Sequence, residues 1–419
     1  MRHRNFRLFF FGQSISLIGT WMTRVATSWL VYRLTNSALL LGTVSFAGQI
    51  PSFLLAPLAG VIVDRCDRRK VLVWTQALAM VQSLLLAALT LSRHINIREV
   101  LILSMTQGII NAFDMPARQS FMVRMVDGRE DLSNAIAINS SMVNLGRLIG
   151  PALAGVMIAA TSEGWCFLAD GISYTAVIAS LLMMRVAHTV EASAHTPMRT
   201  QLREGWEYVA GSAPIRTMLL LFALLSLMGW PFMVLMPVFA ADVLKGGPHT
   251  LGFLSGAVGV GSLLCALSMA MRRSVRGLPP MLVIGAAVFG VGLIGFGFST
   301  SLWLSLAIML VTGFGMMQGL TASNTLLQTL TTEKMRGRVM SYYTMAFVGM
   351  APFGSLLAGA VAHLLGAQRT VIFSGVACLL GALWFWSKLG GIQAQMQPLF
   401  EEMGIMPVHD LKGEEGGEG

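Results

Sequence analysis

Five charged residues could carry chemistry, because each lies within a long apolar run or at its end. They are Arg24, Arg147, Asp114, Asp170 and Asp242. A charged side chain near the bilayer centre costs roughly 2.5–3.5 kcal/mol on insertion scales, so it usually faces a cavity or a partner. At about 1.5 Å per residue, Arg147 is expected roughly 20 Å into its helix, close to the bilayer midplane.

Two interpretations of the arginines stay open. In the first, Arg24 pairs with Asp170 and Arg147 bonds backbone carbonyl groups, so both are structural. In the second, at least one arginine faces a cavity and attracts an anionic or acidic substrate. A carboxylate at mid-depth would be expected instead in an exporter of lipophilic cations, and none is found there.

The aspartates are candidates for proton coupling, because a proton-coupled cycle needs a group that changes its protonation. We rank Asp170 before Asp114 and Asp242, since it lies inside a span, whereas Asp114 could simply end a helix. Polar residues expected to line a substrate path, together with Arg24, are Gln107, Asn111, Gln318 and Asn324. The four cysteines and seven histidines lack metal-ligand spacing, so we expect no metal and no cofactor.

The composition is that of a membrane protein. Of the 419 residues, 55% are hydrophobic and only 12% are charged, whereas soluble domains carry roughly 25% charged residues. The net charge of +9 lies in short clusters between apolar runs, which argues against a nucleic-acid partner. Disordered chains, disulfide scaffolds and ordinary soluble enzymes are excluded as classes.

The apolar runs predict helices that cross a lipid bilayer, since a span needs about 20 apolar residues. They do not alternate as barrel strands would. We predict an all-α membrane protein with twelve transmembrane helices, near residues 8–32, 39–63, 71–91, 98–117, 133–160, 164–186, 216–242, 250–272, 280–298, 302–323, 338–365 and 370–389.

The basic residues predict the orientation, because cytoplasmic loops are enriched in Lys and Arg. With the N-terminus inside, 22 of the 29 Lys and Arg residues fall in inner segments and five in outer segments. Both termini are therefore expected in the cytoplasm.

The chain is predicted to have two halves, because its longest polar interruption lies midway. The expected parts are an N-terminal six-helix bundle (1–186), a cytoplasmic linker with a short amphipathic helix (187–215), a C-terminal six-helix bundle (216–390) and a disordered cytoplasmic tail (391–419).

Two short patterns recur in the same order in both halves. Leu-Gly-x-x-Ser at 41–45 returns at 251–255, and Gly-x-x-Leu-Ala-Gly at 150–155 returns at 354–359. They fall in the second and fifth helices of each half, which indicates a duplication. Pseudo-symmetric repeats are typical of transporters whose substrate site lies between the halves.

The loop after the second helix contains Gly60, Asp64, Arg65, Arg68 and Arg69. It could be no more than a basic inner loop. Its order, however, resembles the signature loop G-x-x-x-D-R-x-G-R-R of the major facilitator superfamily, with Asp67 in place of the second glycine.

The resemblance implies a conformational switch. Asp64 would hold the two halves together on the inner side by pairing with the start of the eleventh helix, where Arg336 and Arg338 lie.

The fifth helix contains Gly146, Arg147, Gly150, Pro151 and Gly155. Small residues let membrane helices approach closely, so packing alone would explain the pattern. The order also resembles the antiporter motif of drug-exporting branches, with Ala154 in place of one glycine. This second similarity favours export over import.

The chain as a whole resembles the enterobactin-exporter-like, or transmembrane secretion effector, branch of the superfamily. Matching segments include 21–25, 111–119, 237–240 and 242–244. The resemblance implies the major facilitator fold and a transporter of the bacterial inner membrane that exports a siderophore or drug-like compound by alternating access, as a proton antiporter and a monomer. Its partners would be the small-molecule substrate, protons and the lipid bilayer.

Two alternatives remain: a non-transporting membrane scaffold or sensor, and a facilitator-fold importer. No nucleotide-binding G-x-x-x-x-G-K loop and no H-E-x-x-H or G-x-S-x-G motif occurs in the chain, which disfavours a primary pump and an intramembrane enzyme.

Overall fold

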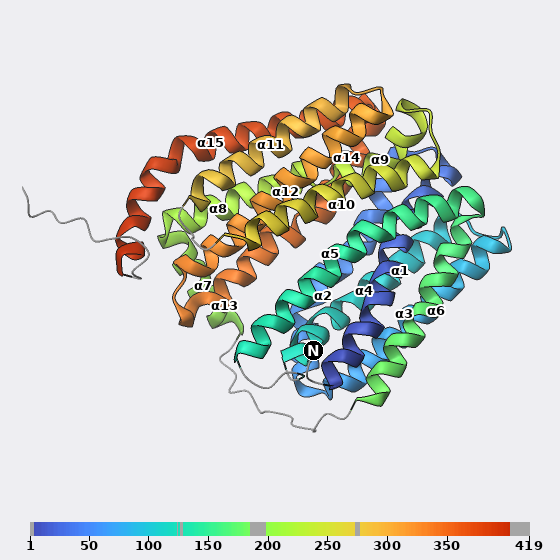
Figure 1. Ribbon diagram of the computed structural model, residues 1–419, viewed down its shortest axis with the longest axis horizontal. Coiled ribbons are helices and arrows are strands. Elements are labelled where there is room, and N and C mark those ends of the chain that lie inside the picture. Colours follow the sequence, from blue (N-terminus) through green and yellow to red (C-terminus); the bar gives the residue numbers. More distant parts are fainter. Residues whose placement is uncertain (1–3, 124, 126–128, 185–197, 273–276, 403–419) are drawn as a thin grey trace, which may run out of the picture.

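The computed structural model describes residues 4–123, 125, 129–184, 198–272 and 277–402, and within these ranges the chain is helical and contains no strand (Figure 1). The helices are α1 (Arg4–Thr35), α2 (Ala38–Arg65), α3 (Arg68–Leu91), α4 (Ile97–Val123), α5 (Arg129–Ala160), α6 (Glu163–Met183), α7 (Met198–Gly211), α8 (Ala213–Leu224), α9 (Phe232–Val238), α10 (Pro248–Ala270), α11 (Leu278–Phe298), α12 (Leu302–Leu330), α13 (Glu333–Thr344), α14 (Ala351–Leu365) and α15 (Ala367–Glu402). Three π-helical turns interrupt longer helices: η1 (Leu225–Gly229), η2 (Phe239–Val243) and η3 (Met345–Gly349).

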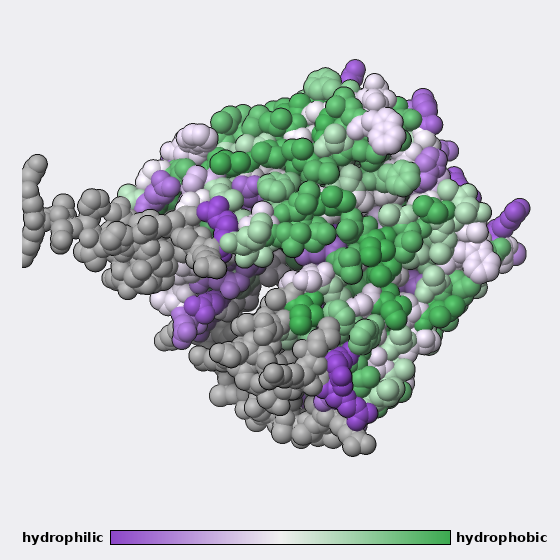
Figure 2. Space-filling view, in the orientation of Figure 1, coloured by the Kyte–Doolittle hydropathy of each residue, from purple (hydrophilic) through white to green (hydrophobic). Residues whose placement is uncertain are grey.

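Ten helices of the described part are long and apolar enough to cross a membrane. The segments 213–243 and 335–365 each count as one, because their π-helical turns bend a continuous span. α1 and α4 fall outside this set, since polar residues recur along both. Apolar side chains cover most of the face in Figure 2, and polar side chains gather toward its two ends.

The tail differs from the expectation. α15 continues through residues 391–402, so this part is helical and the prediction of disorder from 391 was wrong there. The physical reason is that Ile392 is buried against an apolar cluster and extends the packing of the last span. Residues 403–419 and 187–197, in the predicted tail and linker, lie outside the described residues.

The helices pack mainly with others from the same side of the linker. α1 contacts α5 and α6, and α3 contacts α4 and α6. After the linker, α11 contacts α12 and α15, and α10 contacts α12. Extensive contacts between the two groups come from two pairs: α5 with α10, which lie side by side in Figure 1, and α2 with α14.

We call the end of the molecule that contains the α2–α3 turn and α7 the linker end, and the opposite one the far end. The apolar cores differ between them. At the far end one cluster joins both groups of helices, from Met22 in α1 to Phe296 in α11. Toward the linker end each group has its own cluster, around Phe121 in the first and around Phe222 in the second. The two groups are therefore joined at the far end and separate at the linker end.

Glycines make the far-end junction possible. A Cβ atom added to Gly42 would lie 2.5 Å from the carbonyl oxygen of Ser355 and 3.0 Å from the Cα of Gly359. A Cβ atom added to Gly252 would lie 2.8 Å from the Cα of Gly155. These four glycines belong to the two repeated sequence patterns. The Leu-Gly-x-x-Ser pattern of each helix group contacts the Gly-x-x-Leu-Ala-Gly pattern of the other group.

We predict that Gly252→Ala destabilises the protein by about 1–3 kcal/mol, because the added methyl would overpack a backbone contact. The matched control is Gly256→Ala one turn further along α10, where a Cβ atom would meet nothing closer than 4.0 Å. The measurement is the thermal unfolding midpoint of both purified variants. Equal midpoints would contradict the close approach of α5 and α10.

Candidate functional site

Two arginines and two tryptophans meet between the two groups of helices. The guanidinium carbon of Arg24 lies 4.6 Å from the ring centre of Trp21, and that of Arg147 lies 5.1 Å from the same ring. Arg147 also lies 6.0 Å from the ring centre of Trp230. We call these four residues the Arg–Trp cluster. Trp21 and Arg24 come from α1, Arg147 comes from α5, and Trp230 lies between η1 and α9.

The glycines of the fifth-helix motif position this cluster. A Cβ atom added to Gly150 would lie 2.5 Å from the Cβ of Trp21, and one added to Gly146 would lie 3.3 Å from its ring. The smooth face of α5 therefore seats Trp21. Arg147 follows Gly146 in the chain, which brings it beside the indole. On the other side of α5, Gly259 of α10 lets that helix approach the backbone of Arg147.

Within the described residues, no carboxylate lies within ion-pair distance of Arg24 or Arg147. The Nε atom of Arg147 is buried and has no hydrogen-bond partner there. Arg24 is exposed although it lies well inside a 32-residue helix. The ion pair between Arg24 and Asp170 that the structural interpretation requires is therefore absent among the described residues.

A narrow apolar pocket adjoins the cluster. Its unfilled space of about 330 Å³ includes open solvent outside the pocket, and its walls include Trp230, Phe222, Phe289, Met316 and Phe347. Trp230 is held edge-on against Phe347 at a centroid distance of 4.8 Å. The π-helical turn η1 directly precedes Trp230, and such turns often occur at functional sites.

Asp170 is buried between α1, α3 and α6 with hydroxyl partners and no cation. Its Oδ2 atom accepts hydrogen bonds from Thr23 at 2.9 Å and from Ser83 at 3.2 Å. Its Oδ1 atom has no partner among the described residues. A Cβ atom added to Gly19 would lie 2.7 Å from Oδ1, so this glycine makes room for the carboxyl group.

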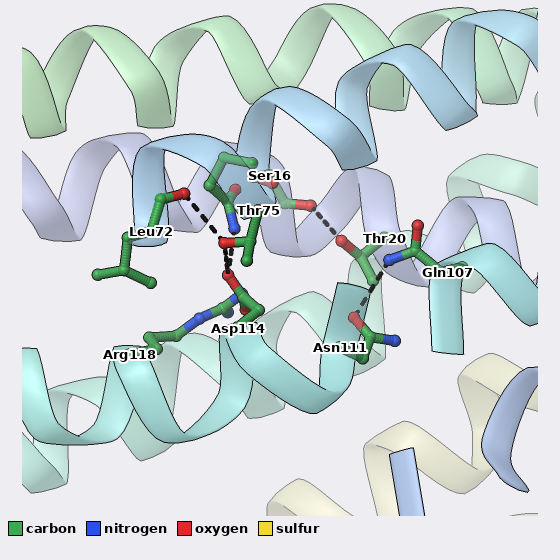
Figure 3. A network of polar contacts seen from close by, with 9 residues as sticks. Ser16, Thr20, Leu72, Thr75, Gln107, Asn111, Asp114 and Arg118 are labelled. Carbon is green, nitrogen blue, oxygen red and sulfur yellow. Dashed lines mark hydrogen bonds and ion pairs between the residues drawn. The ribbon is translucent and has the colours of Figure 1, made fainter. Parts of the chain in front are cut away.

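Asp114 is buried in a different environment (Figure 3). Its Oδ1 atom accepts hydrogen bonds from Thr75 at 3.0 Å and Gln76 at 2.7 Å, and its Oδ2 atom pairs with Arg118 one turn further along α4. These partners allow α4 to continue through Asp114 and Pro116 to Val123. A carboxylate with a cation and two further donors fits a structural role.

The third acid lies at the far end. The hydroxyl of Tyr32 in α1 donates a hydrogen bond to Asp242 in η2, so this bond connects the two groups of helices. It lies in the region where the glycine contacts also join them. Asp242 therefore belongs to the junction rather than to the Arg–Trp cluster.

The other predicted cavity residues separate from one another. Gln107 donates to Asn111 at 3.1 Å within α4. Gln318 is buried and donates to the carbonyl of Met281, which ties α12 to α11. Asn324 accepts a hydrogen bond from Gln328 in the next turn of α12. Of the predicted cavity set, only Arg24 belongs to the Arg–Trp cluster.

At the linker end, Asp64 is exposed and pairs with Arg68 at 3.3 Å. Arg69 donates to the carbonyl of Leu182 at 2.7 Å, and a Cβ atom at Gly60 would meet nothing within 4 Å. Of the remaining predicted switch residues, Arg65 and Arg336 are exposed. Among the described residues no hydrogen bond or ion pair joins Asp64 to α13, so that pairing stays a prediction.

Arg338 instead pairs with Glu204 of α7, the helix in the linker. Next to this ion pair, the rings of Trp206 and Tyr342 lie 6.1 Å apart. Gly205 lets α7 approach, since a Cβ atom there would lie 3.0 Å from the Tyr342 ring. Arg338, which was expected to pair with Asp64, is therefore bound by the linker helix α7 instead.

Sequence reasoning assigned no role to Trp21, Trp230, Tyr32, Ser83 and Glu204. The spacing Trp21-x-x-Arg24 would have indicated a ring and a cation on one helix face. Trp230 and Ser83 gave no comparable signal, because their partners are distant in the sequence.

The chain matches over residues 1–407 a family described as transmembrane secretion effector. A staphyloferrin A transporter of Staphylococcus aureus is 28% identical over 90% of this chain and 95% of its own. An enterobactin exporter of Escherichia coli is 27% identical over 91% of this chain and 90% of its own. A multidrug efflux pump of Mycolicibacterium fortuitum is 26% identical over 86% and 90%, respectively.

Solved transporter structures share the fold. A bacterial homologue of the human lysosomal transporter Spinster, inward-facing and occupied, has a TM-score of 0.74 at 11% identity, over 93% of this chain and 97% of that one. A nucleoside transporter has a TM-score of 0.70 at 13% identity, over 91% and 98%. At this identity the likeness concerns the fold alone.

The environment of Asp114 predicts a loss of stability on substitution. We expect Asp114→Asn to lower the free energy of unfolding by about 1–3 kcal/mol, because a buried network loses its charged acceptor. The same change at exposed Asp64, which also pairs with an arginine four residues on, should cost less than about 0.5 kcal/mol. Thermal unfolding of the two variants compares them, and equal midpoints would count against a structural role for Asp114.

Proposed function

The chain belongs to the transmembrane secretion effector family of the major facilitator superfamily, so it is a small-molecule export transporter and not an enzyme. We propose that it works by alternating access as a proton antiporter. The cargo would be a siderophore or a drug-like compound, as the names of the relatives suggest. The observation that carries this proposal is the reciprocal pair of glycine contacts, which joins the two groups of helices at the far end, whereas the described residues of each group have separate apolar clusters toward the linker end.

We infer twelve spans in two pseudo-symmetric six-helix bundles, the ten apolar spans together with α1 and α4. Both bundles would lie in a bacterial inner membrane with the linker end and both termini in the cytoplasm, where the excess of Lys and Arg is expected. In that orientation the described conformation is inward-facing. The substrate would then enter from the cytoplasm and reach the Arg–Trp cluster.

Asp170 is our candidate for the proton carrier. It can gain or lose a proton without breaking an ion pair, because hydroxyl groups are its partners. Asp114 is bound to Arg118 and Asp242 to Tyr32, so a change in their protonation would also disturb packing contacts.

The test is efflux from bacteria lacking their own exporters. Expression of the chain should lower the retention of at least one compound in a panel of siderophores and antibiotics, and an uncoupler should abolish the effect. An unchanged panel would favour the scaffold or sensor. Increased uptake would favour the importer.

In vesicles, Asp170→Asn should abolish efflux driven by a pH gradient but leave substrate counterflow, since exchange does not require a net proton movement. The control is Glu99→Gln in the first turn of α4, a carboxyl group outside the cluster and outside the acids considered. Gradient-driven efflux that survives Asp170→Asn would remove this residue as the carrier.

We propose that the switch at the linker end works by exchange of ion pairs. Glu204 binds Arg338 while the linker end is open, and Asp64 would replace it when that end closes. The helix N-terminus of α13 would also favour an anion nearby.

Asp64→Asn should therefore shift the population toward the inward-facing state, and Glu204→Gln should shift it toward the outward-facing state. Spin labels at native Cys66, an exposed cysteine beside the loop, and at an introduced Gly337→Cys on α13 would report the separation. Shifts in the same direction for both variants would contradict the exchange.

A further inference from the structure

We propose that the Arg–Trp cluster binds an aromatic organic anion, with the acidic group held by Arg24 and Arg147 and the flat body held beside Trp230, at the mouth of the adjoining apolar pocket. This inference rests on the proposed function, because it names the substrate class of that exporter. It is tested by equilibrium binding, which requires no transport.

The positive charge of the cluster favours an anionic ligand. Two guanidinium groups approach the same indole, and no carboxylate among the described residues lies within ion-pair distance of either. Among the described residues, repulsion between the two cations is then opposed by the electron-rich ring faces of Trp21 and Trp230. A bound anion would remove this repulsion, and guanidinium groups offer up to five donors each to an acidic group.

The orphaned donor points to the same ligand. The Nε atom of Arg147 is buried without a partner, and a buried donor left unpaired is costly. The side chain of Arg24 is exposed. The cluster therefore combines the exposed side chain of Arg24 with a buried, unpaired Nε atom of the partly buried Arg147, which suits an acidic group that enters from the space between the helix groups.

Trp230 and the apolar pocket favour an aromatic body on the same ligand. Trp230 lies 6.0 Å from Arg147 and at the same time forms a wall of the apolar pocket. A ligand whose acidic group reaches the arginines would thus have its body beside Trp230 and at the mouth of the pocket. Flat rings stack well on indoles, and an apolar body is favoured over a polar one there.

The cluster takes its arginines from one helix group and Trp230 from the other. The affinity of a ligand that contacts both helix groups would therefore depend on how the two groups are positioned relative to each other. Binding in one conformation and release in the other then follow from moving Trp230 relative to the arginines, which is a reason for a substrate site to span the halves.

The experiment uses the purified full chain in phosphatidylcholine nanodiscs. Titration calorimetry would compare 2-naphthoate, 2-naphthylmethanol and 2-naphthylmethylammonium, which share one ring system and differ in charge. The naphthoate should bind at least about tenfold more tightly than the alcohol, and the ammonium compound should bind least. Equal affinities for all three would overturn the proposal without any variant.

Variants locate the site. Arg24→Gln and Arg147→Gln should each weaken naphthoate binding at least about tenfold while binding of the alcohol stays within about twofold. Arg24→Lys should retain part of the affinity, and it guards against a folding defect in the neutral variant. The control is Arg98→Gln, which removes an exposed arginine from the first turn of α4. Unchanged binding in both glutamine variants would overturn the proposal.

An anionic lipid could supply the same acidic group. Phosphatidylglycerol added to the nanodiscs should not compete with naphthoate. Competition would assign the cluster to a lipid headgroup and overturn the proposal. Arginine-dependent binding without uncoupler-sensitive efflux would instead support the binding site and contradict the proposed export function. Failure of the binding proposal and failure of the proposed function are therefore distinguishable.

Discussion

Two positive charges without a negative partner are the constraint on which this structure depends. The hydrocarbon core of a bilayer supplies neither a counter-charge nor a hydrogen bond, so a guanidinium group among membrane helices needs a ring face, water or a ligand. Here Trp21 serves both Arg24 and Arg147. Gly146 and Gly150 of α5 lack the side chains that would collide with Trp21. The glycine motif of α5, which helix packing alone could explain, therefore also positions the Arg–Trp cluster.

The same use of small residues explains why the molecule opens at one end. Gly42 with Gly359, and Gly155 with Gly252, bring backbones into contact at the far end. The apolar core is shared there, while each helix group has its own core near the linker end. Such a junction can act as a pivot, because two glycine contacts related by the sequence repeat allow rotation with little change in packing. The hydrogen bond from Tyr32 to Asp242 adds a polar contact at the same level.

The helical class, the membrane location and the family were predictable from the sequence, because apolar runs and loop motifs are local signals. The repeats also identified the glycines that join the helix groups. The site was less predictable. Arg24 and Arg147 were found from the cost of a buried charge, but their shared partner Trp21 was not, since aromatic residues are common in spans.

Contacts between distant segments explain the remaining differences. Gln318 was a reasonable cavity residue by type, yet it binds the Met281 carbonyl and packs two helices. Glu204 gave no sign of meeting Arg338, because 134 residues separate them and the pairing depends on where the linker helix lies. The helical residues 391–402 depended on the burial of Ile392 against helices far earlier in the chain.

The most direct test is the position of a bound halogen. A structure of the full chain with 6-bromo-2-naphthoate should place the bromine beside Trp230 and the carboxylate between the two guanidinium groups. Bromine density only at the lipid-facing surface, with the Arg–Trp cluster unoccupied at saturating ligand, would contradict the account.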